Sequence, residues 1–541
     1  MIKQESIGKS LLGMSRSVIV VAIAFWSLTL ILLLHRHYSF YPAHTSFEQG
    51  VFNQLFWNGT QGQIFQSSLA STLSSAVVGE GNLPAVSYYR LGQHFNPALL
   101  LWLPLYLLIP APVTLLVLQV TLVTAAGLVL YALARQRLNQ QHSTLVTNSF
   151  YAASTVIGST LVNFHDLCQL PLYFFGLLLA LEKRWWWLFG VLATLILSIR
   201  EDTGVILFSL GVYLLLSRRY LGIGLIVCAA SLGYMLVVTN LLMPLFSEDV
   251  FRQFMIEQFG QYAEGEQSST LQVIWALISH PERLMVKIIT PFYRKIGYLL
   301  WQWLPLALIP AISPVAWAVS IFPLLHLFIR DDTTALAINL RYAMTVAPAF
   351  FYGAIIWWSQ HPNALKPWFR RFWLFCIGFS LVFTLASNPN RAWSFIIPDS
   401  IEPLVYVSLP RQWQHASNIR LLLQQIPGDA SVSATTHMLP HLSNRRALLE
   451  FPELMFLNEA GEESQVGYAV ADLWQLQKYQ AAFQADREQL LAMVVAIEQM
   501  REQGEYGLVS LKDGVVLMQR GEESHPDALK AWEQFRQGLE P

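Results

Sequence analysis

Long apolar runs fill most of the first 387 residues and leave few alternatives to a membrane-embedded helical fold. Hydrophobic residues make up 54% of the 541-residue chain and charged residues only 13%, whereas ordinary soluble domains contain about 25% charged residues. A helix needs roughly 17–25 mainly apolar residues to cross a bilayer. We therefore predict a mainly α fold, a polytopic membrane helical bundle.

About eleven of these runs are long enough to be interpreted as crossings. Basic loops favour the cytoplasmic side, and placing Arg16, Arg137, Lys183 and Arg219 there gives one consistent topology with the N-terminus inside. The run at 98–109 has only twelve residues between prolines, so we expect a short helix on the outer face, the alternative being one half of a membrane hairpin. The eleven runs are residues 18–34, 112–134, 145–164, 167–181, 185–199, 203–216, 221–242, 295–309, 312–329, 343–358 and 372–386.

Acidic residues mark a second domain. Fifteen of the 35 acids precede Asp399, and the other 20 lie in the last 143 residues. Residues 430–434 alternate like a strand, and Asp513-Gly514 is typical of a hairpin turn between residues 507–511 and 515–518. We predict a transmembrane domain at 1–387 and an extracytoplasmic soluble α/β domain at 388–541. The topology also places residues 243–294 outside, as interfacial helices.

Acids are scarce where the chain is most apolar. Only six occur between Val18 and Leu242, and Asp166, Glu201 and Asp202 stand within or against runs long enough to cross a membrane. An ionised side chain at membrane depth costs several kcal/mol unless it faces a partner or a wet cavity. The predicted topology places all three at the outer side, so we interpret them as a candidate site.

Four polar motifs carry a family resemblance. They are Ser46-Phe47-Glu48-Gln49-Gly50, His94-Phe95-Asn96-Pro97, Asn163-Phe164-His165-Asp166 and Arg200-Glu201-Asp202. With these motifs in this order, the chain resembles a bacterial family of predicted membrane proteins of unknown function. Its layout is also similar to type C glycosyltransferases, which take a sugar from a polyprenyl-phosphate carrier and transfer it with inversion.

The resemblance implies two catalytic carboxylates. Glu48 matches the first-loop acid that acts as general base or metal ligand, although that acid is usually Asp, and Asp166 matches the second-loop acid. A divalent metal, Mg or Mn, is left open, with Glu48, His165 and Asp166 as candidate ligands. The alternatives are that Glu48 belongs to a helix-capping cluster with Ser46 and that Asp166 serves a helix dipole.

The remaining candidates are substrate-binding. Arg200 suits the donor phosphate, because guanidinium binds such anions in a bidentate manner, but the triplet Arg200-Glu201-Asp202 is equally consistent with an internal salt bridge. Arg341 is a second phosphate candidate or a snorkelling arginine. The full predicted set is Gln49, His94, His165, Arg200, Glu201, Asp202, Arg341 and Tyr342.

These inferences predict a glycosyltransferase of the plasma (inner) membrane that transfers a sugar from a polyprenyl-phosphate donor to a glycan, lipid or protein acceptor at the outer face. The lipid bilayer is an expected partner, and nucleic acid is not. The alternatives are a transporter or flippase of a lipid-linked substrate, and a non-catalytic scaffold. In the outer domain, His437, His441 and Arg445 are interpreted as a solvated loop, or as residues that touch the acceptor.

Overall fold

The computed structural model describes residues 15–42, 46–247, 275, 278–330 and 333–539, and the chain divides into two compact units. Unit 1 comprises residues 1–31, 91–102 and 116–390. Unit 2 comprises residues 32–90, 103–115 and 391–541. Most of the predicted interfacial segment 243–294 lies outside the described residues.

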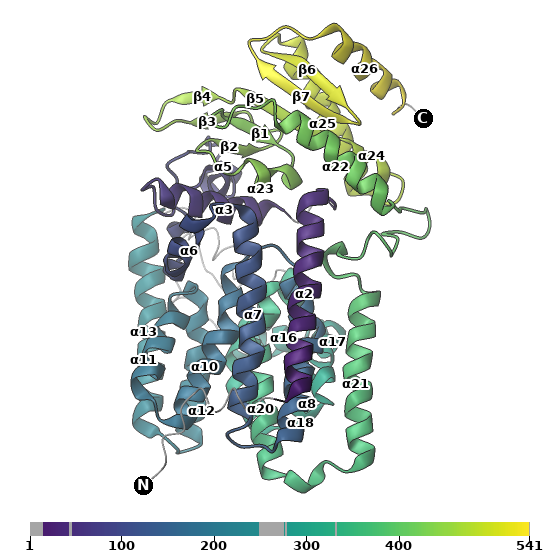
Figure 1. Cartoon of the computed structure of the whole chain (residues 1–541). Coiled ribbons are helices and arrows are strands. Elements are labelled where there is room, and N and C mark those ends of the chain that lie inside the picture. Colours follow the sequence, from purple (N-terminus) through teal and green to yellow (C-terminus); the bar gives the residue numbers. More distant parts are fainter. Residues whose placement is uncertain (1–14, 43–45, 248–274, 276–277, 331–332, 540–541) are drawn as a thin grey trace. The chain divides into compact units, whose positions relative to one another are not determined.

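Unit 1 is helical. Helices α10, α11, α12 and α13 run side by side, each packed on the next in sequence (Figure 1). Its helices, including α2 and α7 which continue into unit 2, are α2 (Arg16–Ser39), α7 (Pro112–Ala134), α8 (Gln140–Ala152), α9 (Ser154–Thr160), α10 (Leu170–Lys183), α11 (Trp186–Leu197), α12 (Gly204–Leu216), α13 (Leu221–Val237), α16 (Pro281–Ile289), α17 (Phe292–Trp303), α18 (Ile309–Ile312), α19 (Pro314–Phe328), α20 (Ala347–Gln360) and α21 (Pro367–Ala386).

Four helical segments in the described part of the chain are long and apolar enough to cross a membrane: Arg16–Ser39, Pro112–Ala134, Leu221–Leu245 and Pro367–Ala386. Each of the other predicted runs contains at least one helix, but these are shorter. The predicted count of about eleven crossings is therefore not confirmed. The run at 98–109 forms a 3₁₀ turn, η3 (Pro97–Trp102), followed by the six-residue helix α6 (Leu103–Leu108).

Helix α21 bridges two interruptions in neighbouring helices. The helical path is interrupted between α8 and α9. At this point Ser380 Oγ donates to Ala152 O at 2.8 Å and accepts from Ser154 N at 3.3 Å. Two turns earlier in α21, Trp373 Nε1 donates to Ser149 Oγ and to Pro305 O just after α17. Backbone groups freed by a break must find partners where water is absent, and α21 supplies them.

Unit 2 contains a mixed five-stranded sheet of order β2-β1-β5-β7-β6, in which β2, β1 and β5 are parallel and β7 and β6 antiparallel. A separate pair, β3 and β4, is antiparallel. The strands are β1 (Val432–Ala434), β2 (Leu448–Glu450), β3 (Met455–Leu457), β4 (Glu463–Gln465), β5 (Tyr468–Asp472), β6 (Tyr506–Lys512) and β7 (Val515–Arg520).

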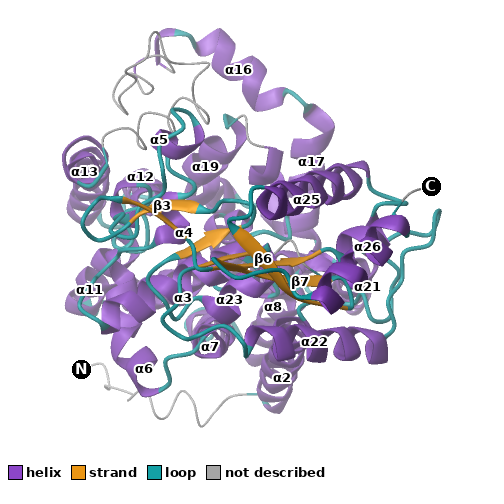
Figure 2. Ribbon diagram, turned by 90° about the horizontal axis from the view of Figure 1, so that it is seen from above, coloured by secondary structure: helices purple, strands orange, loops and turns teal. Residues whose placement is uncertain are grey.

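Helices cover both faces of this sheet (Figure 2). Alternation along a strand sends successive side chains to opposite faces, so Ala469 and Ala471 of β5 join the core under α25 and α26. Val470 and Asp472 consequently face the other side, where α22 packs. The helices of unit 2 are α3 (Phe47–Thr60), α4 (Ser68–Ser71), α5 (Ser75–Val78), α6, α22 (Leu409–Leu423), α23 (Leu439–Leu442), α24 (Trp474–Tyr479), α25 (Gln484–Glu502) and α26 (Pro526–Gln537).

The predicted hairpin is present. Asp513 and Gly514 have φ angles of 55° and 77° and join β6 to β7, which is the backbone that a two-residue hairpin turn requires. The predicted strand at 430–434 appears as β1.

Candidate functional site

Two polar segments of unit 1 meet at the predicted site. His94 Nδ1 lies 2.9 Å from Glu201 Oε1, and the backbone N–H of Phe95 donates to Glu201 Oε2 at 2.9 Å. A further backbone bond, from Ala98 N to Ser198 O, joins the same two segments. Glu201 is buried, so it fixes the loop that carries His94 and sets which ring nitrogen of His94 faces a carboxylate.

Asp166 is also buried and engaged by protein donors. Its Oδ1 accepts from Leu167 N at 2.8 Å and its Oδ2 from Asn96 Nδ2 at 3.3 Å. The neighbouring His165 turns away, because its Nε2 donates to Ser159 O at 3.2 Å. Adjacent residues therefore do not aim two ligands at one point, and the described residues contain no group of three His, Cys, Asp or Glu arranged for a metal ion. The metal stays a prediction, and no step below is assigned to one.

Three arginines surround one tyrosine ring. Arg200, Arg330 and Arg341 place their guanidinium carbons 5.6, 4.7 and 5.1 Å from the centroid of Tyr342. Tyr342 belongs to the 3₁₀ helix η11 (Arg341–Thr345), which packs against the turn that begins at Asp166. Positive charge is thus concentrated beside the two carboxylate-bearing segments.

Arg200 forms an internal salt bridge, which was one of the two interpretations of the triplet Arg200-Glu201-Asp202. Its Nε and Nη2 donate to the two carboxylate oxygens of Asp202 at 2.7 and 2.5 Å. A bidentate pair holds the guanidinium plane in a fixed orientation, so the salt bridge and a role for Arg200 at a ligand are compatible. Arg330 was not among the predicted site residues. The signal for it was its position directly after the apolar run 312–329, ahead of Arg341.

The opposite ends of α10 and α12 carry a different cluster. Glu182, near the end of α10, accepts two hydrogen bonds from Arg219 and two from Arg137, all between 2.9 and 3.0 Å. Tyr352 contributes a longer bond of 3.4 Å. The basic loops predicted on the cytoplasmic side are therefore tied together, at the far end of the helices that start after Asp166 and Arg200.

Glu48 and Gln49 belong to unit 2, in the first turn of α3. Ser46 precedes the helix but its side chain makes no capping hydrogen bond, so the predicted capping role of Ser46 is not seen. Gln49 is buried and donates to Pro112 O at 3.0 Å. The structure does not test the predicted roles of Glu48 and Gln49, which stay predictions.

Buried amides fix α3 within unit 2. Asn53 donates to Ser443 Oγ and Asn444 Oδ1 at 2.8 and 2.7 Å, and it accepts from Tyr106 at 2.7 Å. Gln54 donates to the carbonyl of Arg445 at 2.9 Å. Since such buried groups are costly to leave unpaired, this network sets the orientation of the helix that carries Glu48.

The interpretation of His437, His441 and Arg445 as a solvated loop is wrong. His437 and Arg445 are buried, and Arg445 donates to the carbonyls of Leu442, Pro427 and Ala430. His441 Nε2 donates to His37 O at 3.0 Å. Each side chain is hydrogen-bonded inside the fold: Arg445 closes backbone turns after β1, His441 binds a carbonyl of α2, and His437 binds the carboxylate of Asp472.

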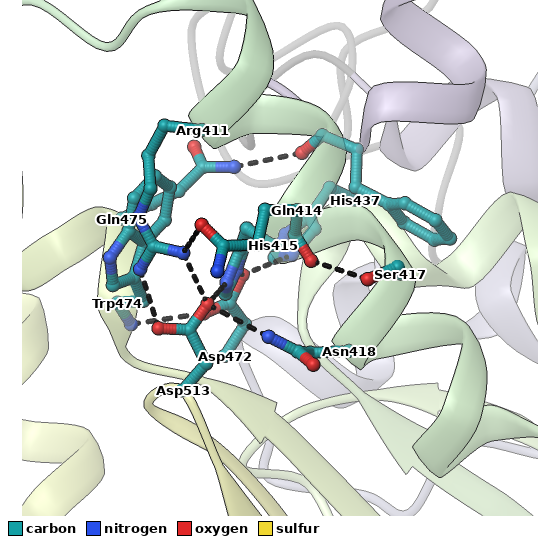
Figure 3. Close-up of polar contacts among 11 residues, drawn as sticks. Arg411, Gln414, His415, Ser417, Asn418, His437, Asp472, Trp474, Gln475 and Asp513 are labelled. Atoms are coloured by element: carbon teal, nitrogen blue, oxygen red, sulfur yellow. Dashed lines mark hydrogen bonds and ion pairs between the residues drawn. The ribbon is translucent and has the colours of Figure 1, made fainter.

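A buried ionic network that no sequence pattern indicated joins α22 to the sheet (Figure 3). His415 lies between two carboxylates, with Nε2 2.9 Å from Asp472 and Nδ1 2.8 Å from Asp513. His437 Nε2 donates to the same oxygen of Asp472 at 2.9 Å, and Arg411 forms a bidentate pair with Asp513. Asp472 is the last residue of β5, and His437 comes shortly after the adjacent parallel strand β1. Both residues therefore lie where these two parallel strands end.

Protonation of His415 should make the stability of unit 2 depend on pH. Burial lowers its pKa, but Asp472 and Asp513 outweigh burial and raise the pKa to about 9 from 6.5. The imidazolium therefore stabilises the fold fully below pH 6.5, and this contribution, about 3 kcal/mol, is lost as the pH rises through 9. We expect hydrogen exchange in β5 and α22 to accelerate between pH 7 and 9 after correction for intrinsic exchange. A His415→Gln variant, which cannot titrate, should show no such extra acceleration, and equal profiles would contradict the assignment.

Comparison with known proteins identifies the family to which the chain belongs. None of the curated proteins matches the chain. The model of a family described as predicted membrane protein (DUF2079) matches residues 36–517, a span that includes Glu48, the unit 1 cluster and the network around His415. The chain therefore belongs to the DUF2079 family of predicted membrane proteins.

Proposed function

We propose that the protein is a membrane glycosyltransferase that transfers a sugar from a polyprenyl-phosphate donor to an acceptor hydroxyl on a glycan, lipid or protein at the outer face of the plasma membrane. The observation that carries the proposal is the convergence of Arg200, Arg330 and Arg341 on Tyr342. Guanidinium groups from three separate segments suit a phosphate, whose oxygens accept several charge-assisted hydrogen bonds at once.

A groove lined in part by the residues that precede Arg341 fits the lipid part of such a donor. It has a volume of about 530 Å³ and is lined by aromatic rings of α17 and α21 and by residues 336–339. Asn339, in its wall, lies two residues before Arg341. The aromatic rings suit an isoprenoid chain, Arg294 and Asn339 add polar groups to the lining, and the backbone continues from Asn339 to Arg341.

In the proposed reaction the acceptor oxygen attacks the anomeric carbon while the bond from that carbon to the phosphate oxygen breaks. Glu48 takes the proton of the attacking hydroxyl, as a general base does. The arginines stabilise the negative charge on the departing polyprenyl phosphate. Asp166 and the His94–Glu201 pair position the acceptor.

Transport is the alternative, and the Glu182 cluster supports the enzyme. A transporter must open its substrate path to both sides of the membrane, so charge pairs that join elements moving against each other separate in every cycle. A transferase works from one side and leaves these pairs intact. Four charge-assisted hydrogen bonds on one carboxylate favour the static role.

Phosphate recognition is tested by binding. Farnesyl phosphate should bind the protein in lipid nanodiscs more tightly than farnesol, measured by calorimetry. Arg341→Gln and Arg330→Gln should each weaken farnesyl phosphate binding by about 10–100-fold, the loss of one or two hydrogen bonds to a charged group. Arg371→Gln, at an exposed arginine at the start of α21, is the matched control. Equal affinity for phosphate and alcohol, or equal affinity of all the variants, would overturn the proposal.

A further inference from the structure

A short hairpin in unit 2 presents large apolar side chains to the outside. Residues 399–406 turn back on themselves through two backbone bonds, Asp399 N to Val405 O at 2.9 Å and Val405 N to Ser400 O at 3.0 Å. The tip residues Ile401 and Leu404 are 78% and 69% exposed. Both values are high for aliphatic side chains, because exposing apolar surface to water is unfavourable in free energy.

The exposure does not come from a missing core. Val405 and Val407, which alternate with Leu404 and Tyr406, are 3% and 4% exposed and pack with Tyr41, Trp474 and Tyr479. The chain therefore buries one side of this segment completely and leaves the other side apolar. Surfaces of this kind usually mark a contact with a membrane or a partner.

The base of the hairpin is held firmly. Asp399 accepts from Ser394 Oγ at 2.7 Å and from Tyr41 at 3.3 Å, and Tyr479 donates to the same carboxylate. Arg391 lies over the ring of Tyr479 at 4.8 Å. The tip is thus carried on a fixed support, and its two aliphatic side chains point outward together as a unit.

Residues on both sides of the hairpin in the sequence contact the end of α2 within unit 2. The ring of His35, in the last turns of α2, lies 5.1 Å from Phe395 and 5.7 Å from Trp413. Arg420 donates to Tyr38 O at 2.8 Å. Helix α2 is a candidate span whose apolar run stops at Leu34, so these contacts occur at the level where hydrocarbon gives way to headgroups.

We propose that the hairpin 399–406 is a membrane-surface anchor whose tip, Ile401 and Leu404, inserts into the headgroup and acyl boundary of the bilayer. The aromatic residues around it, Tyr406 and Trp413, have the amphipathic rings that are enriched at this boundary. An apolar tip inserted to this shallow depth adds buried area without crossing the membrane. The anchor fixes unit 2 to the lipid surface independently of any substrate.

The test uses the full chain in nanodiscs. Leu404→Cys, with Cys168, Cys228 and Cys376 replaced by alanine, is labelled with the environment-sensitive fluorophore NBD. We expect a blue-shifted emission and a loss of intensity when brominated lipid replaces ordinary lipid. Glu462→Cys, at an exposed position between β3 and β4, is the control and should show neither change.

Each other outcome overturns the anchor. Emission from position 404 that matches the control means that the tip is in water. A blue shift without quenching by brominated lipid means that protein covers it, either a second copy of the chain or another partner. Should the cysteine-free chain not fold, a photoreactive benzophenone residue at position 404 of the wild-type chain gives the same decision, because mass spectrometry separates lipid adducts from protein adducts.

Discussion

Replacing Asp472 with alanine is expected to lower the free energy of unfolding of unit 2 by about 3–5 kcal/mol, the cost of removing one partner from a buried ionic network. Asp472 accepts from His415, His437 and the backbone N–H of Trp474. All three donors would lose their acceptor in a place that water does not reach. The imidazolium of His415 would keep only Asp513, so its pKa should also fall.

Hydrogen exchange measures this loss segment by segment. Protection in β5, β7 and α22 should drop by a factor of about 100 to several thousand, the conversion of that free energy. Glu533→Ala, at an exposed site on α26, removes the same charge and should leave protection unchanged. If the two variants behave alike, the network does not hold α22 on the sheet.

Replacing Glu48 with glutamine is expected to slow sugar transfer by about 100- to 10,000-fold, the contribution of a positioned general base. The substitution preserves size and hydrogen bonding but cannot accept the proton of the acceptor hydroxyl. Binding of farnesyl phosphate should not change, because the phosphate is assigned to the arginines around Tyr342.

Transfer is followed in proteoliposomes with polyprenyl-phosphate carriers bearing radiolabelled hexose. Glu80→Gln is the matched control, since Glu80 is an exposed carboxylate of the same unit. A Glu48→Gln variant as fast as the control would remove Glu48 from the chemistry and leave it as a first-turn residue of α3. Loss of transfer together with loss of farnesyl phosphate binding would instead indicate a misplaced helix.

Local patterns predicted local structure well. Asp513-Gly514 predicted the β6–β7 turn because few other residue pairs accept two positive φ angles in succession. The apolar runs located helices because a chain in lipid must satisfy its backbone internally. Those runs did not reveal where a helix breaks. At Ala153 the break falls in a run without glycine or proline, and Ser154 N there donates to Ser380 in α21. After Trp303 the chain does contain a helix breaker, Pro305, whose carbonyl accepts from Trp373.

Non-local contacts were beyond the sequence. His415 and Asp472 are 57 residues apart, and nothing in either local pattern indicates the other. His437, His441 and Arg445 were misinterpreted for a related reason, because a cluster of polar residues has the same composition whether it is solvated or hydrogen-bonded inside the fold. The acidic motifs were easier to place. Charged residues are so rare in unit 1 that few other groupings were possible. The sequence could therefore predict that His94, Asp166 and Arg200 share one location.

The bridging role of α21 has a consequence for biosynthesis. Ser154 and its partner Ser380 are 226 residues apart, so at about 5–20 residues per second the ribosome needs roughly 10–45 s to produce Ser380 after Ser154. During that interval the carbonyl of Ala152 and the N–H of Ser154 lack the hydrogen bonds that Ser380 later makes with them. The segment must wait beside the insertion machinery or in contact with water, and nascent chains that stop short of residue 380 should be recognised as incomplete by membrane quality control.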